Sequence, residues 1–343
     1  MRHPPTPLRV LVMSLLVTTV LTACGDRDQR VIPLPDCLDL EAVYAITGPE
    51  SVGLFSWPEV GELADELGSE YADEFPEGPL TVFGPGEESG TFDSFTELAI
   101  EPLAEAAGVE EDNWLPRPDY ISSPNDNVIV DGVAGTPGSF GWVGHAFAEE
   151  NPASIRSFAV AGEDGRCIVP DDETIASGRY PLSRALYIYV NLERAAEDEA
   201  LTAYVDRYLG DEGRQAVADS GYVQLDDGAW AETQAAWTEV GGHPGAVPEE
   251  GVSGEIRVSG SSTVEPISSL VAEAFSRDHP SAAVAVDGPG TGDGFELFCS
   301  GETDISDASR PIEDAEAEDC AASGIEYVEL KVAIDGLSLV TRS

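Results

Sequence analysis

A short turn near the C-terminal end of the chain combines glycine and hydroxyl residues in a way that could bind an anion. Residues 260–263 (GSST) follow an apolar run that ends at Val258 and precede Pro266 and an apolar-periodic segment. This pattern predicts a strand, a tight turn and a helix, because Pro favours the first turn of a helix. Hydroxyls and free N–H groups at the positive end of a helix form an anion site. Taken alone, such a turn is also typical of an ordinary helix cap.

Two other segments repeat the construction of strand, turn and helix. Residues 79–83 (PLTVF) predict a strand that runs into a turn with residues 89–91 (SGT), and a helical pattern follows. Residues 282–286 predict a further strand, which ends in the glycine-rich turn 288–294 (GPGTGDG) before another helix. Hydroxyl and backbone N–H donors therefore recur at three predicted helix starts.

A fourth turn adds a positive charge. Residues 304–311 (DISDASRP) predict a strand that enters a turn carrying Ser309 and Arg310. A guanidinium group matches a tetrahedral oxyanion through two parallel hydrogen bonds. The alternative for Arg310 is a surface salt bridge in an acidic protein. If the four turns converge, helix starts and N–H groups could hold an anion without a counter-ion.

The composition limits the classes of partner. The chain has 343 residues, 42% of them hydrophobic, which suffices for one large domain or for two lobes with separate cores. Its 65 acids and 17 bases give a net charge of −48, so we expect neither nucleic acid nor an anionic membrane surface as a partner. The acids are spread along the whole chain, which is typical of a solvated acidic surface. An anion would have to bind through local dipoles against this field.

The N-terminal segment predicts export. Two basic residues, Arg2 and Arg9, precede an apolar run over residues 10–20. This run is too short for a membrane span and is typical of a secretory signal. The ending LTAC resembles a bacterial lipobox, so we expect a signal peptide over residues 1–23 and lipid attachment to Cys24. An ordinary signal peptide or an uncleaved anchor is the alternative. Residues 24–36 would then form a polar tether.

Several segments suggest how the chain is connected. Residues 181–191 (PLSRALYIYVN) are rich in β-forming residues and long enough to cross between lobes. Residues 241–254 (GGHPGAVPEEGVSG) form the clearest linker, and residues 327–339 predict a final long strand. Helices are predicted over 57–67, 92–107, 198–209, 212–220 and 295–300.

The histidines argue against an enzyme. Of four, His3 lies in the signal and His243 in the linker, while His145 and His279 lie far from the four turns. No His-x-x-x-His spacing, no His/Asp cluster typical of a metal site and no Gly-x-Ser-x-Gly elbow occurs in the sequence. We therefore expect no catalytic residues, no metal and no cofactor.

Three motifs give the chain a resemblance to a known family: GSSTVEPI, GPGTGDGFELFCSGETDISDASRP and VFGPGEESGTFDSFTE. Together they resemble the periplasmic phosphate-binding proteins (PstS-like) of the high-affinity phosphate ABC importer, over nearly all of residues 37–343. The order departs from the family, in which GSSTV opens the mature chain and SGTF follows later. The chain thus resembles a circular permutant, which exposed connections tolerate. A gene-model or assembly artefact is the alternative.

The resemblance implies an α/β fold of two lobes, the type II periplasmic-binding-protein or venus-flytrap fold, with phosphate in the cleft. One lobe would cover residues 37–183. The other would cover residues 184–343, with the last strand crossing back to the first lobe. The phosphate ligands carried over by motif are Ser89, Gly90, Thr91, Ser262, Thr263, Val264, Thr291, Ser309 and Arg310.

The chain departs from some family members at two ligand positions. Where those members have an arginine before the SGT motif this chain has Pro85, and where they have an aspartate it has Ser309. It resembles instead the branch with a Ser-Arg-Pro turn. A carboxylate that accepts the proton of HPO₄²⁻ would exclude sulfate. The candidates for this acceptor, each of which could instead be a solvated or capping acid, are Asp293, Glu88, Asp93 and Asp126.

The resemblance also sorts the five cysteines. With Cys24 lipidated, it implies one disulfide within each lobe, which suits an oxidising exterior. The implied pairs are Cys37 with Cys167 and Cys299 with Cys320.

The implied function is capture of inorganic phosphate outside the membrane and delivery to the membrane subunits of an ABC permease. The protein would be an extracytoplasmic monomer, anchored to the membrane through lipid on Cys24. The alternatives are a sensor or a binder of another oxyanion on the same fold, and a secreted phosphatase, since fold alone does not determine function.

Overall fold

The computed structural model of the chain describes residues 33–87, 89–246, 248 and 251–343, which belong to one compact unit. The predicted signal peptide, Cys24, the tether up to residue 32 and Glu88 lie outside the described residues. Among the described residues, no helix is both long and apolar enough to span a membrane.

The strands are mostly short. Their bounds are β1 (Cys37–Leu38), β2 (Thr81–Gly84), β3 (Ile121–Ser122), β4 (Ser139–Gly144), β5 (Ile155–Ser157), β6 (Ala159–Ala161), β7 (Cys167–Ile168), β8 (Ser183–Asn191), β9 (Ser253–Gly260), β10 (Ser281–Asp287), β11 (Ile305–Ala308) and β12 (Tyr327–Arg342). Strands β4, β11 and most of β12 are buried, whereas β3 and much of β10 are exposed.

The main sheet has the strand order β10-β9-β11-β8-β12-β4-β2-β3, and β5 pairs with the end of β12. Strands β10, β9 and β11 are parallel to one another, as are β4, β2 and β3, whereas β8 and β12 run antiparallel to their neighbours. Strands β1, β6 and β7 form a separate small sheet. Parallel strands joined by helices are the pattern of an α/β fold.

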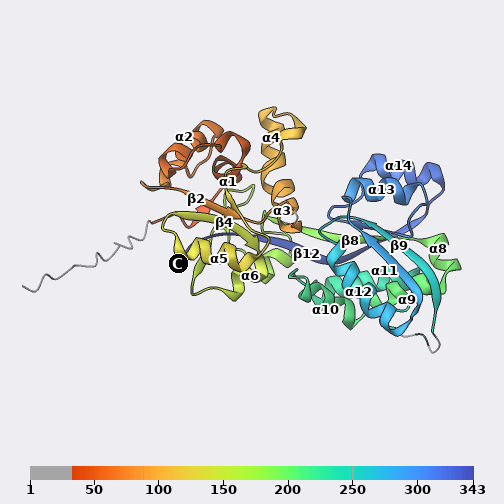
Figure 1. The fold of residues 1–343 in the computed structure, drawn as a ribbon. Helices are drawn as coiled ribbons and strands as arrows, with labels where there is room; N and C mark the ends of the chain where they lie inside the picture. The colour runs from red at the N-terminus through yellow and green to blue at the C-terminus, as the bar shows by residue number, and fades with distance from the viewer. Residues whose placement is uncertain (1–32, 88, 247, 249–250) are drawn as a thin grey trace, which may run out of the picture. The chain divides into compact units, whose positions relative to one another are not determined.

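Strand β12 connects the two parallel groups. Its residues Tyr327–Gly336 pair with β8, and Leu337–Val340 then pair with β4 (Figure 1). The predicted strand over 327–339 is therefore present and continues to Arg342. Strand β8 lies within the predicted segment 181–191, between β11 and β12.

The helices cover the sheet, and several of them begin at side chains expected of caps. Asp39, Ser89, Asn191 and Asp226 each accept a backbone N–H at a helix start. The helices are α1 (Leu40–Thr47), α2 (Trp57–Leu67), α3 (Gly90–Phe95), α4 (Glu101–Ala107), α5 (Asp126–Gly135), α6 (His145–Glu150), α7 (Asp172–Ala176), α8 (Leu192–Glu197), α9 (Glu199–Tyr208), α10 (Asp211–Asp219), α11 (Asp227–Glu239), α12 (Glu265–Asp278), α13 (Thr291–Cys299) and α14 (Asp314–Ser323).

The helix predicted over 92–107 is interrupted. A π-helical turn over Thr96–Ile100 separates α3 from α4, and Pro102 follows in the first turn of α4. Proline has no N–H for the i→i−4 ladder, which explains why the helical hydrogen bonds change at this point. The chain over residues 90–107 nevertheless remains helical throughout.

The core packs apolar side chains on both faces of the sheet. Helices α9 and α12 cover one side of β9 and β10, and α13 lies on the other side with α14 (Figure 1). One large cluster of buried residues includes Trp142 of β4, Ile188 of β8 and Leu337 of β12. The predicted linker 241–254 contains no helix in its described part, and β9 begins within it at Ser253.

Candidate functional site

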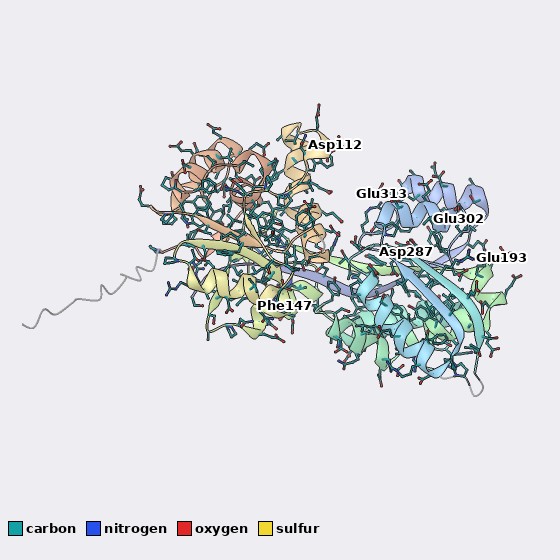
Figure 2. The ribbon with its side chains drawn as sticks, in the orientation of Figure 1. Asp112, Phe147, Glu193, Asp287, Glu302 and Glu313 are labelled. Carbon is teal, nitrogen blue, oxygen red and sulfur yellow. A yellow bond between two sulfur atoms is a disulfide. The ribbon has the colours of Figure 1, made fainter. Side chains whose placement is uncertain are left out.

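Three of the predicted turns lie at one edge of the sheet. Strands β10, β9 and β11 are parallel neighbours and end at Asp287, Gly260 and Ala308. Because parallel strands place their carboxyl ends at the same edge, the turns that follow them lie side by side. Asp287, labelled in Figure 2, marks the end of β10. In open α/β sheets, ligands bind at this edge.

Two glycines allow the first turn and α13 to come close together. Gly260 has a φ of 148°, and a Cβ there would lie 2.0 Å from the carbonyl oxygen of Asp307. A Cβ on Gly294 would lie 2.4 Å from the Cα of Gly260. The Gly290 N–H donates to the Gly260 carbonyl at 2.9 Å. The first and second turns are therefore in direct contact, and side chains at Gly260 or Gly294 would force them apart.

The first turn uses its backbone donors internally and directs a hydroxyl to another element. The Thr263 N–H donates to Ser261 Oγ at 3.2 Å, and the Val264 N–H donates to the Ser261 carbonyl at 3.1 Å. Ser262 Oγ donates to Asp93 Oδ2 of α3 at 2.5 Å. The N–H groups of Thr263 and Val264 are thus bonded within the turn, whereas the hydroxyl of Ser262 is bonded to another element.

The second and fourth turns are joined by their hydroxyls. Thr291 is the first residue of α13, and its Oγ1 lies 3.0 Å from Ser309 Oγ. The Ser309 N–H also donates to Thr291 Oγ1 at 3.2 Å. Ser309 is buried. These two predicted site residues therefore lie side by side.

The SGT turn contacts the first turn from the other group of parallel strands. Ser89 caps α3, since its Oγ accepts from the Thr91 N–H at 3.2 Å. A Cβ on Gly90 would lie 3.4 Å from the Cα of Thr263 and 3.7 Å from the carbonyl oxygen of Ser262. Residues that are about 170 positions apart in the sequence thus meet.

A buried arginine that the motifs did not identify lies beside these turns. The Arg184 side chain is 9% exposed, and its Nη2 donates to Thr263 Oγ1 at 3.0 Å and to Ser94 Oγ at 2.8 Å. It forms an ion pair with Glu97, and its Nε lies 3.6 Å from Asp335 Oδ2. One polar network therefore joins β8, α3, β12 and the first turn. The sequence feature that could have indicated this role is a basic residue, which is rare in this chain, inside the apolar strand segment 181–191.

Asp93 and Asp335 are carboxylates of this network. Burial raises the pKa of Asp335, against the opposing effects of Arg184 and the hydrogen bond from Ser94. Burial also raises the pKa of Asp93, against the hydrogen bond from Ser262 and the charge of Arg184. Both carboxyl groups therefore hold a proton more strongly than an exposed aspartate does.

Strand β11 brings another buried carboxyl to the same edge. Asp307 is fully buried, and its Oδ1 accepts from Ser268 Oγ at 3.0 Å. Burial raises the pKa of Asp307 to about 8, and the negative charges of Glu265 and Asp287 add to the shift. Its Oδ2 has no hydrogen-bond partner among the described residues.

Arg310 is engaged with acidic side chains. Its Nη1 and Nη2 donate to the two carboxylate oxygens of Glu316, each at 2.8 Å, and its Nε lies 3.4 Å from Glu313. The guanidinium carbon lies 5.7 Å from the centre of the Phe295 ring. The hydrogen bonds that Arg310 donates to Glu316 raise the pKa of Arg310. The salt bridge given above as the alternative for this residue is thus present, next to Ser309.

The four candidate acceptor acids lie in different places. Asp93 contacts the first turn through Ser262. Asp293 lies exposed in the first turn of α13. Asp126 is the first residue of α5, where burial raises its pKa. Glu88 lies outside the described residues.

The two implied disulfides are present. Cys37 is bonded to Cys167 and Cys299 to Cys320, with Cα–Cα distances of 5.9 and 4.2 Å. The pairing is therefore confirmed.

Comparison with known proteins found a matching family model and similar sequences. Residues 245–343 match the family model of the PBP superfamily domain. The protein SphX of Synechocystis sp. is 33% identical over 217 residues, which cover 60% of each chain. The phosphate-binding protein PstS of Staphylococcus haemolyticus is 46% identical over 88 residues, or 26% of this chain and 28% of that protein. The chain is thus similar in sequence to SphX and PstS over these segments. It spans 60% or less of the length of these relatives.

A solved structure shows the same type of fold. The phosphate-binding protein of a phosphate ABC transporter from Streptococcus pneumoniae has a TM-score of 0.56 at 18% identity, covering 78% of this chain and 90% of that one. The α/β fold is therefore of the periplasmic-binding-protein type. PstS and the pneumococcal protein are named as phosphate-binding proteins, which agrees with the expectation of a binding protein rather than an enzyme.

Proposed function

We propose that the chain binds inorganic phosphate where the four turns meet and delivers it to an ABC permease. The observation that carries the proposal is the contact of the SGT turn with the turn after β9, at the carboxyl edge of β10, β9 and β11. Ligands bind at such edges, and helix starts suit anions. The names of PstS and of the pneumococcal protein agree with this ligand.

The ligand groups proposed are the hydroxyls and backbone donors of the turns, with charge from arginines. They comprise the motif residues Ser89, Gly90, Thr91, Ser262, Thr263, Val264, Thr291, Ser309 and Arg310. The N–H groups of Thr263 and Val264 donate to Ser261 within the first turn, so they would have to exchange this partner for the anion. Arg184 joins the motif residues, because it donates to Thr263 Oγ1 and supplies the guanidinium that Pro85 cannot. In an acidic protein, such buried donors let an anion bind against the overall field.

Asp93 is the acceptor that we propose for the phosphate proton. Its Oδ2 accepts a hydrogen bond from Ser262, and burial raises its pKa, so it binds a proton more readily than an exposed aspartate does. Sulfate has no proton to donate, so a carboxylate facing it would be left unpaired, which costs free energy. The site would therefore select HPO₄²⁻ over sulfate.

Calorimetric titration with phosphate and with sulfate, in high salt, tests this function. We expect phosphate to bind and sulfate not to, and Thr91→Val to weaken phosphate binding by about 1 kcal/mol through loss of a neutral hydrogen bond. Thr238→Val in α11, where the threonine is exposed, is the matched control. Equal binding of both anions would indicate a general oxyanion binder. Absence of phosphate binding would exclude the proposal, and release of product from a chromogenic phosphoester would favour a phosphatase.

We propose further that the protein is exported and anchored through lipid on Cys24, after removal of residues 1–23, with residues 24–36 as tether. The two disulfides support an oxidising compartment. Labelling of expressing cells with a palmitate analogue tests the anchor. We expect label on the wild type and none on Cys24→Ala. Equal labelling of both would exclude lipidation at this residue.

The permuted order and the two-lobe division, 37–183 and 184–343, also belong to the proposal. Residues from both ends of this span contact the same segment: the Ala159 N–H donates to the Asp36 carbonyl at 2.9 Å, and the Ser343 N–H donates to the Ser154 carbonyl at 3.2 Å. A short connection could therefore join them. A rearranged chain that begins at residue 254, runs to 343 and continues from 37 to 240 should fold and bind phosphate alike. A rearranged chain that does not fold would argue against permutation, and peptide mass mapping of the native protein tests for an assembly artefact.

A further inference from the structure

A second polar cluster lies around a buried histidine, in a cavity that the four turns do not line. The cavity has a volume of 450 Å³, and its walls include His145, Glu149, Asp172 and Tyr222. His145 and Glu149 lie one turn apart on α6, and Asp172 begins α7. Phe147, labelled in Figure 2, marks α6. The sequence did not suggest this cluster, because Asp172 comes from a different helix.

The imidazole of His145 is oriented toward the two carboxylates. The residue is 2% exposed, and its Nδ1 lies 3.2 Å from Ser338 Oγ of β12. When Nδ1 donates its proton to this hydroxyl, the lone pair of Nε2 faces Glu149 and Asp172. In metal-binding histidines, a hydrogen bond of this kind from the other ring nitrogen fixes the orientation of the ring.

The spacing around Nε2 is that of ligands rather than of hydrogen-bonded partners. Nε2 lies 3.7 Å from Glu149 Oε1 and 3.6 Å from Asp172 Oδ1, and it has no hydrogen-bond partner among the described residues. Hydrogen bonds from nitrogen to oxygen are about 2.7–3.2 Å long. With bonds of about 2.0–2.1 Å to a tetrahedral Zn²⁺, neighbouring ligand atoms lie about 3.3–3.4 Å apart. The one ligand atom from each residue lies within 4.8 Å of the others.

We propose that His145, Glu149 and Asp172 bind a divalent transition-metal ion of the Zn²⁺ type. A neutral imidazole nitrogen and two carboxylates are ligands that Zn²⁺ accepts. Ca²⁺ and Mg²⁺ prefer oxygen ligands, so we expect them to bind more weakly to a site with a nitrogen ligand. A cation would satisfy the buried Nε2 and neutralise the two acids beside it. The cavity gives it an entry path and room for a water ligand, and the net charge of −48 attracts cations. This proposal does not depend on phosphate binding.

Titration of the phosphate-free protein with Zn²⁺, in excess Mg²⁺ to occupy the acidic surface, tests the site. We expect one Zn²⁺ per chain, and visible absorption bands of a low-coordinate ion when Co²⁺ replaces it. Glu149→Gln and Asp172→Asn each remove an exposed ligand and should weaken Zn²⁺ binding at least tenfold. Glu150→Gln, an exposed acid on the same helix, is the matched control and should leave it unchanged.

Two further variants separate ligation from structure. His145→Asn should abolish the Co²⁺ bands, and Ser338→Ala should weaken Zn²⁺ binding less, as expected for a positioning residue. Circular dichroism without metal reports whether these buried substitutions fold. If these two variants do not fold, the Zn²⁺ affinities of Glu149→Gln and Asp172→Asn decide whether the proposal holds. Zn²⁺ binding that is absent, or equal in these two variants and in Glu150→Gln, would overturn the proposal.

Discussion

Arg184 Nη2 donates to Thr263 Oγ1 at 3.0 Å, although the two residues are 79 positions apart in the chain. Through this bond, a buried guanidinium on β8 contacts the turn after β9. The same guanidinium lies 3.6 Å from Asp335 Oδ2. The proposed phosphate site and this buried ion pair therefore share one side chain.

Replacing Arg184 with Met should destabilise the protein and weaken phosphate binding. Removing one partner of a buried ion pair costs about 3–5 kcal/mol, because Asp335 stays buried without its cation. Urea unfolding measures this loss, and the double variant Arg184→Met/Asp335→Asn should recover part of it. Calorimetry should show weaker phosphate binding in the double variant as well. A double variant that is stable and binds phosphate normally would remove Arg184 from the site.

Replacing Arg310 with Ala tests whether this residue binds phosphate despite its pairing with Glu316. If it does, affinity should fall by about 1.5–3 kcal/mol, the range for hydrogen bonds to charged groups. Glu316→Gln should then tighten binding, because it frees the guanidinium. Arg179→Ala, which removes an exposed arginine paired with Glu173, is the control. Unchanged phosphate affinity in both Arg310→Ala and Glu316→Gln would show that Arg310 does not bind phosphate and only forms the salt bridge to Glu316 of α14.

Asp307 should make stability depend on pH. Its pKa of about 8 in the folded protein exceeds the value of about 3.9 in the unfolded chain, so the folded state binds the extra proton between these values. Its contribution to stability is therefore present at low pH and is lost as pH rises from about 4 to about 8.

Asp307→Asn should remove this dependence. Relative to the wild type, its free energy of unfolding should improve between about pH 5 and about pH 9, measured by urea titration. Asp112→Asn, at an exposed position labelled in Figure 2, is the control. A parallel pH dependence of wild type and Asp307→Asn would contradict the pKa of Asp307.

The two disulfides should differ in their effect on stability. Cys37–Cys167 closes a loop with a sequence separation of 130, and Cys299–Cys320 one of 21. In the chain-entropy model these correspond to about 5 and about 3.4 kcal/mol. Replacing the first pair by Ala should therefore lower the free energy of unfolding by about 1.5 kcal/mol more than replacing the second. The reverse order in urea unfolding would indicate that packing around the buried Cys299 and Cys320 outweighs the loop term.

The regular elements that position the site could be predicted, because each had a local signal. Pro266 indicated α12, and the alternation of glycines and hydroxyls indicated the turns after β2, β9 and β10. Helix α13 begins at Thr291, four residues before the predicted start at 295, because glycines in its first turn obscured the pattern. Helices α11 and α14 were missed, since both are rich in alanine and acids and bury few side chains.

The polar network could not be predicted, because it depends on contacts between distant segments. Nothing local to Arg184 indicates Ser94, Thr263 or Asp335 as its partners. The same holds for Arg310, where the sequence left both an anion ligand and a salt bridge open, and its pair with Glu316 became visible only in three dimensions. The cluster at His145 was missed for this reason too.

Strand β12 takes part in both parallel groups of the sheet within sixteen residues, and the large buried cluster includes side chains from both. Loss of this one strand would expose apolar surface on both groups at the same time. Thermal denaturation of the protein should therefore be a single cooperative event, with one heat-absorption peak, even though the main sheet contains two separate groups of parallel strands.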